Sequence, residues 1–329
     1  METPPVFPSP PPITPDYRDR RGGLIFFGIS EIILGAFCAL MVPLTLFGQI
    51  MVARQSGHEP MLYLLMPTVL IFAGLGVGLI WLGIGSIQAR RWARTLLLCL
   101  SWIGLVTGIL SLISLVLNSG AMRQAMLQQG GNELPAAGAN VIVAMTVTFA
   151  AIIYVVIPGA LLLFYRSYHV RRTCEVRDPQ QRWTDRCPLP VLIMCLLQIS
   201  GSLCFLIMPR FWSVIPFFGT LVTGWPARLL WIILIIVSLC AARGFYRLNF
   251  HAWLVYLLTV VACLTSTGIT FIHIELIDYY RAIDLPEWHL EMMAKNPLAT
   301  GNYAFASTIL SPVAFVGYLI YLRRYFTTR

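Results

Sequence analysis

Long apolar stretches separated by short polar segments dominate the pattern of hydrophobic and polar positions along this chain. A helix that crosses about 30 Å of hydrocarbon needs about 20 residues. Stretches of that length predict eight transmembrane helices, at 23–43, 60–87, 95–117, 141–166, 188–209, 226–247, 252–274 and 303–322. We therefore expect an all-α integral membrane protein.

Several small or helix-breaking residues recur in the same order in the two halves of the sequence. The pairs are Gly35 with Gly201, Cys38 with Cys204, Pro43 with Pro209, Thr107-Gly108 with Thr267-Gly268, and Pro158 with Pro312. This order predicts two tandem four-helix repeats, at 23–175 and 176–329, behind a Pro-rich arm at 1–22. Because each repeat has an even number of spans, the repeats should be parallel.

Prolines and glycines predict local features of these spans. Pro158 and Pro312 should kink the helices that contain them. The segment 210–225 is expected to lie in the outer membrane interface, and helices are expected to start at Pro60 and Pro226. Gly74 and Gly78 form a small-xxx-small pair that predicts close helix packing.

Composition and charge support the membrane class and suggest an orientation. The chain is 58% hydrophobic and 11% charged, with a net charge of +9 and a mean hydropathy of +0.76. Seventeen of the 23 basic residues fall in the termini and the loops expected on the same side. By the positive-inside rule, both termini should be cytoplasmic. The basic residues therefore indicate orientation and lipid contact, and we expect no nucleic-acid partner.

The start of the chain and its first cytoplasmic hairpin refine this picture. Seven prolines precede Arg18, which predicts an extended arm and no secretory signal peptide. The tandem pattern with a basic RRWAR hairpin resembles that of bacterial membrane proteins, which implies the inner membrane. In that hairpin, the residues expected at the cytoplasmic lipid interface are Arg90, Arg91, Trp92 and Arg94.

A few polar residues lie inside the apolar stretches. Glu31 is expected near mid-bilayer, where an ionised acid costs roughly 2.5–3.5 kcal/mol, so we predict a neutral, hydrogen-bonded side chain. Its counterpart in the second repeat is Leu197, next to Gln198. Thr265, Ser266 and Thr267 either line a small polar cavity or bond neighbouring backbone.

The outer stretch 271–297 is the most varied chemically. Its candidate partner-binding residues are His273, Glu275, Asp278, Glu287, His289 and Glu291. Histidine and carboxylates can ligate zinc, but neither H-x-x-x-H nor H-E-x-x-H spacing occurs. A partner-binding surface and a solvated amphipathic loop stay open, and we predict no metal site.

Two functions from different classes fit these features. One is a non-enzymatic scaffold or accessory subunit of a membrane complex, whose partners are lipid and other membrane proteins. The other is a transporter or channel for a small or apolar solute, with a pathway between the repeats. The sequence holds no credible nucleophile–base pair and no ligand set, so we expect neither an enzyme nor a cofactor.

Overall fold

The computed structural model describes residues 17–56, 62–130, 136–207, 212–285, 290 and 302–326. Its α-helices are α1 (Arg21–Ser56), α2 (Leu62–Ile87), α3 (Arg91–Leu117), α4 (Ser119–Gly130), α5 (Ala136–Ala151), α6 (Ile157–Arg166), α7 (Tyr168–Arg177), α8 (Leu189–Leu206), α9 (Trp225–Tyr246), α10 (Phe250–His273), α11 (Leu276–Ala282) and α14 (Asn302–Leu322). A π-helical turn at Ile152–Val156 joins α5 to α6, and short 3₁₀ turns form at Trp183–Asp185 and Arg323–Tyr325. Two strands, β1 (Val214–Phe217) and β2 (Thr220–Thr223), precede α9.

Seven described helical segments are long and apolar enough to cross a membrane, which confirms a multi-pass helical protein. They are Arg21–Met51, Leu65–Ile87, Arg91–Leu117, Ala137–Arg166, Leu189–Leu206, Trp225–Tyr246 and Phe250–His273. The eighth predicted span, 303–322, coincides with α14, of whose first ten residues only the backbone is described.

The first helix is longer than predicted, because α1 continues through Pro43 to Ser56. A proline inside a helix removes one backbone donor and disturbs the preceding turn. Next to this proline, the Thr45 hydroxyl donates to the Val42 carbonyl at 2.9 Å. The residues after Pro43 are mostly apolar, and the segment 43–56 continues the helix.

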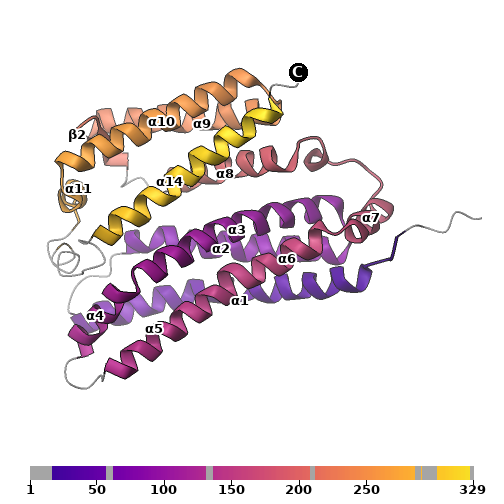
Figure 1. Ribbon diagram of the computed structural model, residues 1–329, viewed down its shortest axis with the longest axis horizontal. Coiled ribbons are helices and arrows are strands. Elements are labelled where there is room, and N and C mark those ends of the chain that lie inside the picture. Colours follow the sequence, from indigo (N-terminus) through magenta and orange to yellow (C-terminus); the bar gives the residue numbers. More distant parts are fainter. Residues whose placement is uncertain are drawn as a thin grey trace, which may run out of the picture.

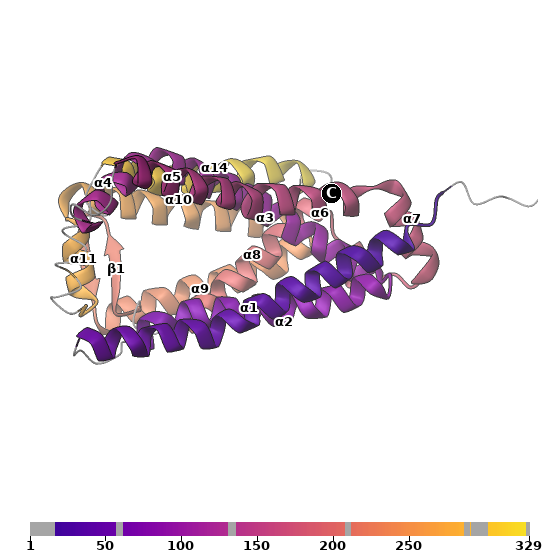
Figure 2. The same ribbon diagram turned by 90° about the horizontal axis from the view of Figure 1, so that it is seen from below.

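The helices form two layers that meet at one end of the molecule. In Figure 2, α1, α2 and α9 lie in one layer and α5, α10 and α14 in the other. The layers converge toward α7 and separate toward α11 and β1. Figure 1 shows that α7 and the C-terminal end of the described chain lie at the same end, opposite α4 and α11.

Glycines allow α1 and α2 to pack backbone against backbone. A Cβ on Gly28 would lie 2.8 Å from the Gly83 carbonyl oxygen, and one on Gly35 would lie 2.9 Å from the Gly76 carbonyl oxygen. The prediction that Gly74 and Gly78 mediate this packing is wrong, since a Cβ on either would meet nothing within 4 Å. The error is one of helix face: Gly76 and Gly83, seven residues apart, lie on the side of α2 that faces α1.

The tight turns between α2 and α3 and between α9 and α10 have the same geometry. Ala89 and Leu248 both have a positive φ, of 54° and 56°. The next residue in each turn donates its N–H to a glycine carbonyl, with Arg90 bonding Gly85 and Asn249 bonding Gly244, both at 2.9 Å. Each glycine also faces an alanine eight residues later in the following helix, too closely for a side chain on the glycine. Each pair of equivalent residues in the two turns is separated by 159 positions.

A second close contact ties α3 to the π-helical turn. A Cβ on Gly108 would overlap the carbonyl of Tyr154, so only glycine fits at this crossing. Pro158 follows within the first turn of α6, where its missing N–H coincides with the disturbed helix ladder. The predicted irregularity at Pro158 is therefore present as a π-helical turn.

The segment between α8 and α9 contains a β-hairpin, a structure that the sequence did not predict for 210–225. Strands β1 and β2 are antiparallel, with Val214 opposite Thr223 and Phe217 opposite Thr220. The two turn residues, Phe218 and Gly219, have φ of 40° and 96°, as a two-residue primed turn requires. Aromatic and β-branched residues favour strands here. Pro226 lies in the first turn of α9, as predicted.

Buried apolar residues form two clusters, one within the first half of the chain and one mainly within the second half, which Cys99 of α3 joins. The first includes Leu24, Leu97, Leu162 and Tyr165. The second includes Val191, Met194, Phe245, Trp253 and Leu319. Trp102 of α3 and Leu189 of α8 pack against both clusters, so α3 and α8 join the halves.

Candidate functional site

Glu31 belongs to a buried hydrogen-bonded chain that joins α1, α2 and α6. It is only 2% exposed. Its Oε1 is 2.9 Å from the Tyr165 hydroxyl, which is 2.7 Å from Oγ of Ser86. Ser86 in turn donates to the carbonyl of Leu24 at 3.1 Å, back in the first turn of α1. Among the described residues, Oε2 of Glu31 has no hydrogen-bond partner.

The backbone of Tyr165 is held from a third direction. Nε of Arg94, in the first turn of α3, donates to the Tyr165 carbonyl at 3.0 Å. A corresponding bond occurs in the second half, where Nε1 of Trp253 donates to the Leu319 carbonyl at 2.8 Å. Tyr165 and Leu319 are both fully buried near the ends of their helices. In each half, a side chain at the start of the third long helix fixes the end of the last.

Asp178 connects the loop after α7 to the start of α3. It is 3% exposed, and it accepts hydrogen bonds from the backbone N–H of Arg91 at 3.3 Å and from the Arg182 guanidinium at 3.1 Å. Burial opposes ionisation of the carboxyl, but these bonds outweigh it, so the pKa of Asp178 lies below its ordinary value. Arg91 also pairs with Asp185 at 3.3 Å. The loop is therefore folded against the start of α3, and we call α7 together with residues 178–187 the α7 clamp.

The predicted lipid-interface residues are engaged within the protein. Arg91 and Arg94 make the bonds described above, and Arg90 donates to the side chain of Gln88 at 3.3 Å. Trp92 stacks on Trp81 with 4.2 Å between ring centroids. The RRWAR hairpin therefore organises the helix ends at the α7 clamp.

The α7 clamp also holds the residues that precede α1. Arg20 N–H donates to the Thr173 hydroxyl at 3.1 Å, and the Arg177 guanidinium pairs with Asp19 at 3.0 Å. Within the clamp, burial raises the pKa of the Cys174 thiol to about 11, so this cysteine stays a neutral packing residue. No group of three or more His, Cys, Asp or Glu side chains suited to a metal ion occurs in the described part of the chain.

Gln198 occupies a buried position in α8 that resembles the position of Glu31 in α1. The buried residues of α8 include Val191, Cys195, Gln198 and Ser202, whose spacing of four, three and four matches that of Leu24, Gly28, Glu31 and Gly35. Gln198 is 3% exposed, whereas Leu197 is only half-buried. By burial, the position in α8 that most resembles that of Glu31 is therefore Gln198. The Gln198 amide lies near the Tyr256 hydroxyl, but neither of its polar atoms forms a hydrogen bond of normal geometry within the described region.

The hydroxyl-rich segment of α10 binds the turn of the β-hairpin. Ser266 accepts from the N–H of Phe218 at 3.0 Å and donates to the Pro216 carbonyl at 3.1 Å. Thr270, one helical turn later, accepts from the N–H of Gly219 at 3.0 Å. Thr265 is exposed and Thr267 is half-buried. The buried hydroxyls of this segment thus satisfy hairpin backbone that would otherwise be unpaired in an apolar setting.

The predicted outer surface is described only in part. His273 bonds the Ile269 carbonyl at 2.9 Å, Glu275 precedes the first turn of α11, and Asp278 pairs with Arg281 at 2.7 Å. Glu287, His289 and Glu291 lie outside the described residues. The described residues His273 and Asp278 thus bond groups within their own helices, and the partner-binding surface stays a prediction.

Sequence reasoning identified Glu31 but missed its partners, Tyr165 and Ser86. A usable signal was present, because Leu24, Gly28, Glu31, Gly35 and Cys38 are spaced alternately by four and three residues. That spacing marks one face of a helix in close antiparallel packing. It places Glu31 against another helix, although no pattern within α1 could name Tyr165, which is 134 residues away.

Comparisons with known proteins leave the chain without an assigned family. No family model, no curated protein and no solved structure matches it. The seven candidate spans place it in contact with a lipid bilayer as a multi-pass membrane protein.

Proposed function

We propose that this chain is a non-enzymatic protein of a bacterial inner membrane that serves as a scaffold or accessory subunit of a membrane complex. The observation that carries the proposal is a stripe of large apolar side chains on α1. Its exposed members are Phe26, Ile33, Phe37, Leu40, Leu44, Phe47 and Met51. Apart from Ser30, which occupies one position, this stripe keeps the alternating spacing of four and three that a supercoiled partner helix requires.

This stripe lies on the face of α1 opposite the glycine contacts with α2. At 100° per residue, Phe26 is about 200° from Leu24 and Phe37 about 200° from Gly35, so one helix carries two packing faces. The first face is filled by α2, and the side chains of the second face are roughly half exposed or more. An apolar stripe of this length fits a transmembrane helix of a partner subunit.

The hydrogen-bonded chain at Glu31 supports a structural role for that residue over transport. Its three contacts, between Glu31 and Tyr165, Tyr165 and Ser86, and Ser86 and Leu24 O, need three hydrogens. The two hydroxyls provide two of them, and a neutral Glu31 provides the third. An ionised Glu31 would leave one short oxygen–oxygen contact without a hydrogen and would leave Oε2 charged, buried and unpaired. We infer a neutral Glu31 that donates to Tyr165, which donates to Ser86.

We further propose that the chain consists of two parallel four-helix repeats, with both termini cytoplasmic. The repeat is supported by the two equivalent turns at Ala89 and Leu248 and by the equivalent bonds from Arg94 and Trp253. The orientation is supported by the basic residues of the termini, the α2–α3 turn, the α7 clamp and the α9–α10 turn. These segments gather at one end of the bundle (Figure 1).

Photocrosslinking in native membranes tests the scaffold proposal. A photoreactive amino acid is placed at Phe37 or Leu40 on the α1 stripe, and at Leu258 of α10 as the control. Leu258 is 59% exposed, close to the 55% and 56% of the two stripe residues. The proposal expects a discrete protein adduct from the stripe alone, identified by mass spectrometry and also recovered with the uncrosslinked chain after mild-detergent purification. Lipid adducts alone at all three positions would contradict it.

A further inference from the structure

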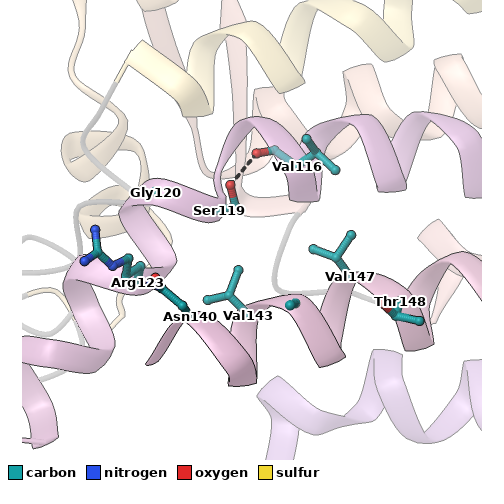
Figure 3. A pocket seen from close by; sticks show the side chains of 9 residues that line it. Val116, Ser119, Gly120, Arg123, Asn140, Val143, Val147 and Thr148 are labelled. Carbon is teal, nitrogen blue, oxygen red and sulfur yellow. Dashed lines mark hydrogen bonds between the residues drawn. The ribbon is translucent and has the colours of Figure 1, made fainter. Parts of the chain in front are cut away.

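A pocket of about 430 Å³ lies between α3, α4 and α5, at the end of the bundle opposite the α7 clamp. Its lining residues are Val116, Ser119, Gly120, Arg123, Asn140, Val143, Ala144, Val147 and Thr148. In Figure 3, Val143 and Val147 point from α5 toward α3, and Asn140 lies beside α4 near Arg123. The pocket is therefore a largely apolar trough with Arg123 and Asn140 at its polar end and Thr148 at the other end.

The trough follows from the way in which α3 and α5 diverge. The contact of Gly108 with the Tyr154 carbonyl holds α3 against the π-helical turn. From this crossing α5 runs toward its start at Ala136, while α3 ends at Leu117 and the chain turns into α4. A Cβ on Gly120 would meet nothing within 4 Å, so the wall contributed by α4 leaves the trough open.

The polar end of the trough presents hydrogen-bond donors and one positive charge. Arg123 is the only charged residue that lines the pocket. It is exposed, and no ion pair joins it to an acidic side chain of the described residues. The amide of Asn140 adds further donor capacity, while the Ser119 hydroxyl donates to the Val116 carbonyl at 2.7 Å. Helix α4 contains no acidic residue that could neutralise the guanidinium.

We propose that this trough binds an acyl chain of an anionic membrane phospholipid, whose phosphate is held by Arg123 and Asn140. The three valines match a hydrocarbon chain, and a guanidinium donates paired hydrogen bonds to phosphate oxygens. The trough begins where the apolar part of α3 ends and the more polar α4 begins, which is the level expected for a lipid head group. Charge complementarity therefore selects a phospholipid over an uncharged apolar solute.

Native mass spectrometry of the full chain in detergent tests this site. The protein is titrated with phosphatidylglycerol and with phosphatidylcholine of identical acyl chains. Since a charge-assisted hydrogen bond is lost, Arg123→Gln should bind phosphatidylglycerol about tenfold more weakly. Arg54→Gln, which removes an exposed arginine in the last turn of α1, is the matched control and should bind like the unmodified chain. Val147→Trp should fill the trough and weaken both lipids.

The outcomes separate a lipid site from other sources of phosphate. Equal weakening by Arg123→Gln and Arg54→Gln would show general surface attraction and overturn the proposal. Inorganic phosphate that competes as strongly as the lipid would also overturn it, because the acyl chain would then contribute nothing. Unchanged binding by Val147→Trp would contradict the trough, and unchanged elution of each variant excludes misfolding as the cause of weaker binding.

Discussion

The two halves of the chain, before and after residue 176, make similar contacts between their helix ends but use different side chains. In both, a tyrosine near the end of the last long helix is tied to a carbonyl at the start of the first. Tyr318 donates directly to the Pro190 carbonyl at 2.7 Å, whereas Tyr165 reaches the Leu24 carbonyl through Ser86. Because Ser86 bonds the Leu24 carbonyl in the first half, the Tyr165 hydroxyl can also bond Glu31. Backbone geometry is thus shared, while buried polar chemistry differs.

The two buried polar residues, Glu31 and Gln198, therefore contribute differently to the stability of the fold. Oε1 of Glu31 is bonded to Tyr165 of α6, which in turn bonds Ser86 of α2, whereas the amide of Gln198 forms no bond of normal geometry in the described structure. A buried polar group without partners costs stability, and one within a network is costly to remove. The matched positions therefore predict different responses to the same substitution.

Glycine substitutions at the third long helix of each half should give the largest contrast. Gly108→Ala places a methyl group against the Tyr154 carbonyl and should lower the free energy of unfolding by about 1–3 kcal/mol, or more. Gly268→Ala meets nothing within 4 Å and should be neutral or stabilising, because alanine favours the helix. Thermal unfolding in detergent measures both. Equal destabilisation by Gly108→Ala and Gly268→Ala would show that the helix packing at Gly108 is no closer than that at Gly268.

Replacing each buried polar residue with leucine should give the next largest difference. Glu31→Leu removes a member of the hydrogen-bonded chain and should cost about 1–3 kcal/mol. Gln198→Leu removes an amide that forms no hydrogen bond of normal geometry in the described structure, so it should be close to neutral. Glu31→Gln, which keeps both a donor and an acceptor, should fall near the unmodified chain. If both leucine variants lost the same stability, the two sites would be energetically alike.

The starts of α3 and α10 should differ in their response to pH. The side chain of Asn249 caps α10 by accepting a hydrogen bond from the backbone N–H of His251 at 2.9 Å. At the start of α3, the backbone N–H of Arg91 instead donates to Asp178 of the α7 clamp. Asn249→Ala should cost about 1 kcal/mol at every pH. Because the pKa of Asp178 is lowered on folding, its contribution is complete above the unfolded carboxyl's pKa of about 3.9 and is lost as pH falls through the folded value.

Unfolding curves of Asp178→Asn and Asn249→Ala between acidic and neutral pH check this contrast. The destabilisation by Asp178→Asn should shrink as the solution is acidified, and that by Asn249→Ala should stay constant. A constant effect of Asp178→Asn would mean that its carboxylate charge contributes nothing to the α7 clamp.

Sequence periodicity predicted most of the helices because apolar length alone identifies a membrane span. Helix α1 ran past its expected end because Pro43 is tolerated inside it, which no length criterion anticipates. The β-hairpin at Val214–Thr223 was missed because its stabilising hydroxyls, Ser266 and Thr270, lie about 50 residues later. Local preference could suggest a turn at Phe218-Gly219, but tertiary contacts decide that it forms.

The candidate site was predictable only as single residues. Glu31 stands out in an apolar run, and its buried face follows from the spacing of Leu24, Gly28 and Gly35. The identity of Tyr165 and Ser86 as partners depends on how α1, α2 and α6 meet. Aligning the two halves of the sequence paired Glu31 with Leu197, one position away from the buried Gln198. A shift of one residue turns a side chain by about 100° around the helix axis, and packing, not the alignment, decides which residue is buried.

The protonation state of Glu31 is the most direct test of its assignment as a structural residue. An infrared difference spectrum between the unmodified chain and Glu31→Gln, recorded in lipid at neutral pH, reports on this carboxyl group alone. The hydrogen-bonded chain predicts the carbonyl stretching band of a protonated carboxylic acid, and Tyr165→Phe should shift that band. Carboxylate bands in place of the acid band would contradict the account and would favour an ion or proton pathway through Glu31.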